Sequence, residues 1–173
     1  MIILEDTRNK PDKHKLKNAF FEKNNVSVQR TKLYVGDYTL PTNQSVCIDT
    51  KENLNEVVSN IIHQHERFRD ECIRAQAANI KLIVLIEETN IKTIDDIKKW
   101  ENPRLHRYNK IKYMHSIGKW LNVPMPKGKP PVNNIQIIKI LTTMQNKYGV
   151  QFMFCTPDKA GATILNLLGG KNE

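Results

Sequence analysis

The sequence predicts an α/β domain in which helices flank a mixed β-sheet. Residues 81–87 (KLIVLIE) form an almost continuous aliphatic run, as in a central strand that is buried on both faces. Short β-prone segments alternate along the chain with amphipathic helical ones, an order typical of α/β domains. A length of 173 residues is sufficient for one domain with a full core.

In the N-terminal half, the predicted order is strand, helix, strand and hairpin. Pro11 opens the helix because proline is favoured in the first helical turn. Two β-prone segments flank polar turn residues near Pro41, a pattern that indicates a hairpin. We expect strands over residues 2–5, 26–33 and 45–51, and a helix over residues 11–22 whose inner side carries Leu16, Ala19, Phe20 and Lys23.

A long helix separates the hairpin from the central strand. Apolar residues recur at helical spacing from Leu54 to Ala78, and Asn79 marks the end. The predicted buried stripe consists of Leu54, Val57, Ile61, Phe68, Cys72 and Ala75. On an adjacent face, polar side chains recur at spacings of four, three and four and therefore line up: Glu56, Asn60, His63 and Arg67.

The C-terminal half is predicted to add a helix–strand–helix unit. Thr93 and Asp96 form the T-x-x-D pattern of a capping box, which indicates a short helix over residues 93–100. Residues 101–131 are irregular and contain prolines, with a helix expected over residues 111–121. We then expect a strand over residues 150–155, a helix over residues 157–168, and before them a helix over residues 133–148 with Ile135, Ile138, Leu141 and Met144 on its inner face.

The net charge of +9 is concentrated in one segment. Residues 98–129 hold nine Lys or Arg and one acid, a local charge of +8, whereas residues 1–97 carry −1. Such a surface suits a polyanionic partner, although a merely solvated basic face is the alternative. Rings that stack on bases or sugars lie between these charges and favour nucleic acid: Trp100, His106, Tyr108, Tyr113 and Trp120.

Composition excludes several other classes of protein. No apolar run is long enough to span a membrane, and the N-terminus turns acidic too early for a signal peptide. The three cysteines are odd in number and scattered in apolar surroundings, which argues against a disulfide or zinc framework. We therefore expect a cytoplasmic protein without a membrane partner.

Asp37, Asp49 and Lys51 give the strongest indication of function. Side chains alternate along a strand, so Asp49 and Lys51 share one face of the second hairpin strand. The hairpin brings Asp37 beside Asp49, and carboxylates are the oxygen ligands that a hard cation such as Mg²⁺ prefers. This set suits metal-dependent phosphodiester cleavage, with Lys51 orienting a water or offsetting charge on the phosphate. Solvated charges on a sheet edge are the alternative interpretation.

The polar row of the long helix supports the same interpretation. It begins five residues after Lys51, so its first turns are expected near the cation site. Arg67 is placed to hold a phosphate through two hydrogen bonds. For Glu56 and His63 a solvated helix face is the alternative.

Three motifs in the first half of the chain resemble those of the XPF-type nuclease domain, within the restriction-endonuclease-like superfamily. Asp6-Thr7-Arg8 is similar to the D-x-R-E motif of that family, with Asn9 in place of Glu. Gly36-Asp37 is similar to its G-D turn, and Asp49-Thr50-Lys51 is similar to its E-R-K motif. The family's next acid falls on Asn55, beside Glu56.

The resemblance implies a restriction-endonuclease-like fold and a single nuclease domain over residues 1–173. We divide it into a catalytic core (1–92), a basic, partly irregular segment (93–131) and a C-terminal helix–strand–helix unit (132–173). By resemblance, the carboxylates of Asp37 and Asp49 and the carbonyl of Thr50 bind Mg²⁺ or Mn²⁺. Lys51 then positions the nucleophilic water, and Asp6 and Arg8 support the site.

The expected function is a Mg²⁺- or Mn²⁺-dependent DNA endonuclease that acts on branched or flapped DNA in replication, recombination or repair. The resemblance to compact stand-alone relatives implies a bacterial or phage-infected host cell. A non-catalytic DNA-binding relative, a ribonuclease and a restriction-type enzyme are the alternatives. Relatives pair through this domain, so a homodimer is expected by analogy. The side chains expected to bind the substrate are Arg8, Arg67, Arg104, Arg107 and Lys110.

Overall fold

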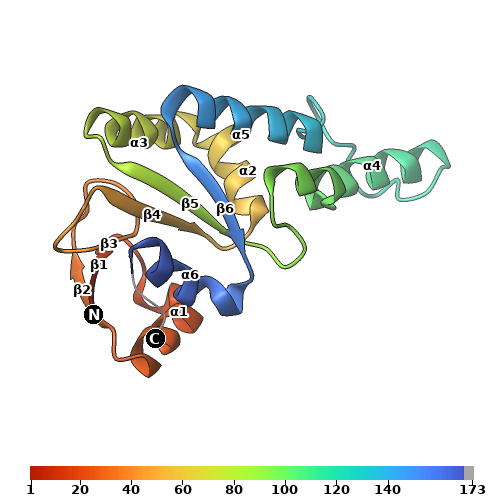
Figure 1. The fold of residues 1–173 in the computed structure, drawn as a ribbon. Coiled ribbons are helices and arrows are strands. Elements are labelled where there is room, and N and C mark those ends of the chain that lie inside the picture. The colour runs from red at the N-terminus through yellow and green to blue at the C-terminus, as the bar shows by residue number, and fades with distance from the viewer. Residues whose placement is uncertain (170–173) are drawn as a thin grey trace.

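The computed structural model describes residues 1–169, and its strands form one mixed sheet in the order β2-β1-β3-β4-β5-β6 (Figure 1). β1 and β2 are parallel, β4, β5 and β6 are parallel, and the short β3 is antiparallel to both β1 and β4. The predicted mixed sheet is therefore confirmed. Its strands are β1 (Ile2–Asp6), β2 (Ser27–Thr31), β3 (Tyr38–Thr39), β4 (Val46–Lys51), β5 (Lys81–Glu87) and β6 (Gln151–Cys155).

Helices cover both faces of this sheet (Figure 1). α2 (Leu54–His63), α3 (His65–Ala77) and α5 (Asn134–Tyr148) cover one face, while α1 (Lys15–Lys23) and α6 (Ala160–Leu167) cover the other. Side chains of β5 alternate between the two resulting cores: Leu82, Val84 and Ile86 pack into the first, and Ile83 and Leu85 into the second. The prediction of a central strand buried on both faces is confirmed.

The predicted inner side of α1 is wrong except at Phe20, which is half-buried and packs against the second core. Leu16 is exposed, as are Ala19 and Lys23, whereas Lys17 and Phe21 are buried. A 3₁₀ turn precedes α1, so the helix begins only at Lys15, later than the sequence indicates. Lys17 is buried because its ammonium pairs with the carboxylate of Glu87 at the end of β5. Because a lysine occupies the buried face, the spacing of apolar residues does not identify that face.

The long helix predicted after β4 is broken at Gln64 into α2 and α3. Gln64 has φ −124° and ψ 28°, outside the helical range. Side chains from His63 to Arg67 are all exposed, so no packed residue holds this stretch to a continuous helix. On either side of the break, the buried stripe from Leu54 to Ala75 is confirmed.

Two predictions in the C-terminal half need correction. α4 spans Pro103–Ser116 and not residues 111–121, because the side chain of Asn102 caps its first turn by accepting hydrogen bonds from the amides of Arg104 and Leu105. In α5, Ile137 and Leu141 are buried while Ile135 is exposed. Six apolar residues from Ile135 to Met144 lie on several sides of the helix, so the sequence alone does not show which side is buried.

The remaining elements agree with the sequence. The capping box of Thr93 and Asp96 is present, although the turn that it starts (Ile94–Lys99) is a 3₁₀ helix. α4 extends outward beyond the sheet, and Ile111 is its one buried side chain (Figure 1). No helix within residues 1–169 is both long and apolar enough to cross a membrane. The end of the C-terminal unit, residues 170–173, lies outside the described residues.

Candidate active site

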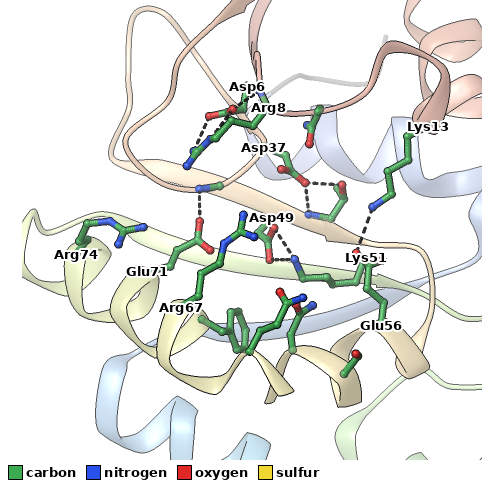
Figure 2. Close-up of a pocket in the computed structure, with 17 residues that line it drawn as sticks. Asp6, Arg8, Lys13, Asp37, Asp49, Lys51, Glu56, Arg67, Glu71 and Arg74 are labelled. Carbon is green, nitrogen blue, oxygen red and sulfur yellow. Dashed lines mark hydrogen bonds and ion pairs between the residues drawn. The ribbon is translucent and has the colours of Figure 1, made fainter. Parts of the chain in front are cut away.

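Asp37, Asp49 and Lys51 meet in one pocket, with a volume of about 290 Å³, where the hairpin lies against α2 and α3 (Figure 2). Asp49 and Lys51 are on β4, and Asp37 comes directly before β3. The predicted juxtaposition of these three side chains is confirmed. Thr50 also lines the pocket.

The turn that carries Asp37 requires glycine at position 36. Gly36 has φ +71°, in the left-handed region that L residues rarely adopt. A Cβ there would lie 3.1 Å from the carbonyl oxygen of Ile48. The Asp37 amide donates to that same oxygen at 2.7 Å, and the Asp37 carbonyl accepts from the Asp6 amide at 2.8 Å. The G-D turn therefore joins β1 to β4 and fixes the position of the Asp37 carboxylate.

Lys51 holds the Asp49 carboxylate through a buried ion pair. Its Nζ donates to Oδ1 of Asp49 at 2.8 Å, and the same nitrogen lies 2.7 Å from Oδ2. Burial raises the pKa of Asp49, with Lys51 opposing this effect and the carboxylates of Asp37 and Glu71 adding to it. Burial alone would lower the pKa of Lys51, but the charges of Asp49, Asp37 and Glu56, with the hydrogen bond to Asp49, together outweigh it and raise that pKa. Lys51 therefore stays protonated.

Thr50 links Asp49 and Lys51 to Asp37. Oδ2 of Asp37 accepts hydrogen bonds from the Thr50 amide at 2.8 Å and from the Thr50 hydroxyl at 2.7 Å. The threonine side chain, which sequence alternation directs away from Asp49, thus fixes the second carboxylate of the site. The predicted role of the Thr50 carbonyl as a metal ligand stays a prediction.

Asp6 and Arg8 form the wall of the pocket that faces β1. Asp6 is buried, and both of its oxygens accept hydrogen bonds from Arg8, at 2.8 Å from Nε and 2.6 Å from Nη2. Its oxygens also accept from the amides of Arg8 and Leu33. Burial opposes ionisation, but these hydrogen bonds prevail and lower the pKa of Asp6. Asp6 is therefore an ionised residue that positions Arg8.

The opposite wall comes from α2 and α3. Of the predicted polar row, Glu56, Asn60 and Arg67 line the pocket. His63 does not, and its Nε2 lies 3.0 Å from Nη1 of Arg104, at the base of α4. That contact connects the basic segment to the end of α2, next to the pocket.

Sequence reasoning missed three charged residues of the pocket: Lys13, Glu71 and Arg74. Glu71 accepts a hydrogen bond from the Gly36 amide at 2.9 Å and so holds the G-D turn from α3 (Figure 2). Glu71 and Arg74 follow Arg67 by four and seven residues, a helical spacing that was available in the sequence. Lys13 pairs with Glu56 at 3.2 Å, and no sequence pattern indicates this contact.

The ERCC4 domain family matches residues 6–168 of the chain. This chain belongs to the ERCC4 domain family. The resemblance to XPF-type nuclease domains is thereby confirmed, and the restriction-endonuclease-like fold is confirmed by solved structures. A search of the curated proteins finds no match to this sequence.

XPF from Aeropyrum pernix has the same fold as this ERCC4 domain, with a TM-score of 0.61 at 13% identity over 97% of this chain. A second structure, described as XPF from Aeropyrum pernix in complex with DNA, gives 0.59 at 14% identity over 96%. The chain spans 63% and 62% of the length of these two relatives.

Besides Asp49 and Thr50, which stand where the E-R-K motif has Glu and Arg, this ERCC4 domain departs from the family pattern at its first and fourth motifs. Asn9 stands in place of the first-motif Glu and lines the pocket. At the fourth motif, Glu56 lines the pocket and Asn55 does not. Both Glu56 oxygens are engaged, Oε1 by Lys13 and Oε2 by the Glu52 amide at 2.8 Å. Glu56 is therefore a carboxylate at the pocket rim that is held by its own partners.

The donor set of the pocket fits a hard divalent cation. Oδ2 of Asp49 is buried and makes no hydrogen bond, although Lys51 is near it. Asp37 supplies a second carboxylate, half-buried at the same pocket. Within residues 1–169, no group of three or more His, Cys, Asp or Glu side chains is arranged to hold a metal ion by itself. Mg²⁺ needs only one or two carboxylates, because substrate phosphate and water complete its shell.

Proposed function

We propose that this ERCC4 domain is a Mg²⁺- or Mn²⁺-dependent DNA endonuclease. The observation that carries the proposal is the pocket itself, in which the paired Asp49 and Lys51 meet Asp37 and Arg67. Membership of the ERCC4 family supports a nuclease, and the DNA-bound relative of the same fold supports DNA as the substrate. A non-catalytic role is disfavoured, because the carboxylates and the lysine that cleavage needs are all present.

Each residue of the pocket has a separate role in the proposed reaction. Bound by Asp37 and Asp49, the cation would polarise the phosphodiester and make a water more acidic. Protonated Lys51 orients the attacking water and offsets the negative charge that develops on the phosphate. Arg67 and Arg8 hold the phosphate. As the water oxygen bonds to phosphorus, the bond from phosphorus to the leaving sugar oxygen breaks. The water gives up one proton to solvent, and the leaving oxygen takes up one proton from solvent. Asp6 acts through Arg8, which it orients.

A cleavage assay on linear, flapped and four-way DNA, beside matched RNA, tests the proposal. We expect cleavage of DNA with Mg²⁺ or Mn²⁺ and none with EDTA, with branched or flapped DNA preferred. Cleavage of the RNA alone would favour the ribonuclease alternative, and a uniform cut at one duplex sequence would favour a restriction-type enzyme. The homodimer and the cytoplasmic location stay predictions.

Asp37→Asn is expected to raise the Mg²⁺ concentration needed for half-maximal cleavage by about tenfold or more, because a neutral amide is a weaker ligand than a carboxylate. In the wild-type protein, the raised pKa of Asp49 lets a proton compete with the cation, so this concentration rises as the pH falls. Cleavage rates over a Mg²⁺ series at several pH values measure both effects. An unchanged Mg²⁺ requirement in Asp37→Asn would remove Asp37 from the metal site.

The basic segment is expected to make DNA binding strongly dependent on salt. If about four to six of its charges contact DNA phosphates, the logarithm of the association constant should fall against log[salt] with a slope of about −4 to −5. Neutralising Arg104, Arg107 and Lys110 should flatten that slope by about two to three. Binding isotherms at several salt concentrations measure it.

A matched control removes three exposed lysines elsewhere: Lys23, Lys81 and Lys139. This control should keep the wild-type slope. An equal change in both triple variants would show that total charge, and not the basic segment, sets the affinity.

A further inference from the structure

The helix α4 and the chain after it form an arm, residues 103–131, that stands clear of the sheet (Figure 1). Ile111 is the one buried side chain of α4, so little of the arm packs against the rest of the domain. The surface of the arm is thus available to a partner.

Large apolar side chains gather at the outer end of this arm. Single exposed apolar residues are ordinary on a protein surface, but a cluster of them marks a binding site. Of the eleven large exposed apolar residues in the described part of the chain, five fall between residues 113 and 125. They are 38% to 71% exposed and comprise Tyr113, Ile117, Trp120, Leu121 and Met125, which we call the arm tip.

Hydrogen bonds hold the arm tip in one conformation. The Lys119 amide donates to the Met114 carbonyl at 2.8 Å, and the Val123 amide donates to the Trp120 carbonyl at 2.8 Å. Nε2 of His115 lies 2.6 Å from the Val123 carbonyl oxygen, which returns the chain to α4. Trp120 has φ +54°, an uncommon conformation for a bulky residue. The backbone that carries Trp120 is therefore held in place before binding, which lowers the entropic penalty of association.

The charge around the arm tip selects the kind of partner. Residues 98–129 contain nine basic residues and only one acid. Nζ of Lys110 lies 5.2 Å from the centre of the Trp120 ring, so a cation adjoins an exposed aromatic surface. Exposed rings beside cations suit a ligand with flat faces and a negatively charged backbone. Single-stranded nucleic acid has both features, whereas a duplex hides the faces of its bases.

We propose that the arm tip binds the unpaired strand of a branched or flapped DNA substrate, with its bases stacked on Tyr113 and Trp120. This inference rests on the proposed DNA endonuclease function, and it names the element that would recognise the unpaired strand. Ile117, Leu121 and Met125 are the other exposed apolar side chains of the arm tip.

The position of the arm suits this role. At its base, Arg104 contacts His63 at the end of α2, the helix that lines the cleavage pocket. The 14 residues of α4 span about 21 Å at ~1.5 Å per residue. A strand stacked as in a duplex advances ~3.4 Å per nucleotide, and an unpaired strand can extend further, so about six nucleotides or fewer reach from the base of α4 to the arm tip.

The test compares Tyr113→Ala and Trp120→Ala with the wild-type protein by fluorescence anisotropy in EDTA, which prevents cleavage. The probes are a single strand, a flapped duplex and a blunt duplex of one sequence. We expect each variant to bind the single strand and the flapped duplex about tenfold more weakly, the effect of losing one stacked base. Binding of the blunt duplex should change less than about twofold.

Matched variants separate stacking from general apolar contact. Tyr113→Phe should retain wild-type binding, whereas Tyr113→Leu, which keeps apolar area without a ring, should resemble Tyr113→Ala. Leu16→Ala is the control for loss of an exposed apolar side chain, since Leu16 and Tyr113 are both 63% exposed. It should bind all probes normally.

The inference is overturned if Tyr113→Ala and Trp120→Ala bind every probe normally, as expected of a surface for a protein partner. It is also overturned if these variants bind the blunt duplex as weakly, relative to wild type, as they bind the single strand. Wild-type binding by Tyr113→Leu would also overturn it. A protein that cleaves no DNA with any cation would instead refute the endonuclease function, while the binding differences among the probes stand by themselves.

Discussion

Lys51→Ala and Asp49→Asn are each expected to reduce DNA cleavage by about 10²–10³-fold or more, the loss typical of a preorganised electrostatic group. Lys51 donates to Asp49 inside the pocket, so both variants remove a member of one buried unit. Lys51→Ala should stay folded, because Asp49, whose pKa burial already raises, can take up a proton when its partner is lost. Asp49→Asn should stay folded because the carboxylates of Asp37 and Glu56 still act on the charge of Lys51. Single-turnover cleavage rates, with thermal unfolding as a check on the fold, measure the effect.

Two variants with the same substitutions at exposed positions serve as controls for Lys51→Ala and Asp49→Asn. Lys139→Ala removes an exposed lysine on α5, and Asp70→Asn neutralises an exposed acid on α3 outside the pocket. Both should cleave at the wild-type rate. Wild-type turnover by Lys51→Ala or Asp49→Asn, in a protein that unfolds at the normal temperature, would show that cleavage takes place elsewhere.

Glu87→Ala is expected to lower the free energy of unfolding by about 3–5 kcal/mol, the usual effect of leaving a buried charge without its partner. Glu87 pairs with Lys17 between β5 and α1, and their side chains are 8% and 4% exposed. Neither residue lines the pocket that holds Asp49 and Lys51, so folded Glu87→Ala should cleave DNA normally. Urea denaturation measures the free energy of unfolding, and the cleavage rate per folded molecule is measured separately.

The double variant Lys17→Met/Glu87→Leu should recover most of this loss, because well-packed apolar residues can replace a buried ion pair. Asp95→Ala breaks the exposed pair between Asp95 and Lys98 and should change stability little. If Glu87→Ala were as mild as Asp95→Ala, the Lys17–Glu87 pair would contribute to stability no more than a surface ion pair.

The meeting of Asp37, Asp49 and Lys51 in one pocket could be predicted from the sequence because its parts are local. A glycine before Asp37 and the alternation of Asp49 and Lys51 along one strand determine a turn and a shared face within a short hairpin. Helical spacing likewise brought Glu56 and Arg67 to the pocket, even though the helix breaks between them. In the hairpin, strand alternation decides where the side chains point, and Glu56 and Arg67 reach the same pocket from two separate helices, α2 and α3.

The tertiary structure decided what depends on contacts between distant segments. Lys17 is buried only because Glu87, 70 residues later, meets it across the face of the sheet. Glu71 positions the G-D turn only because α3 packs opposite Gly36. A local pattern carries no information about which buried charge finds a partner, or which carboxylate accepts a hydrogen bond from another element. The sequence by itself determined the carboxylates and the lysine of the site, and three-dimensional packing determined the residues that hold them in place.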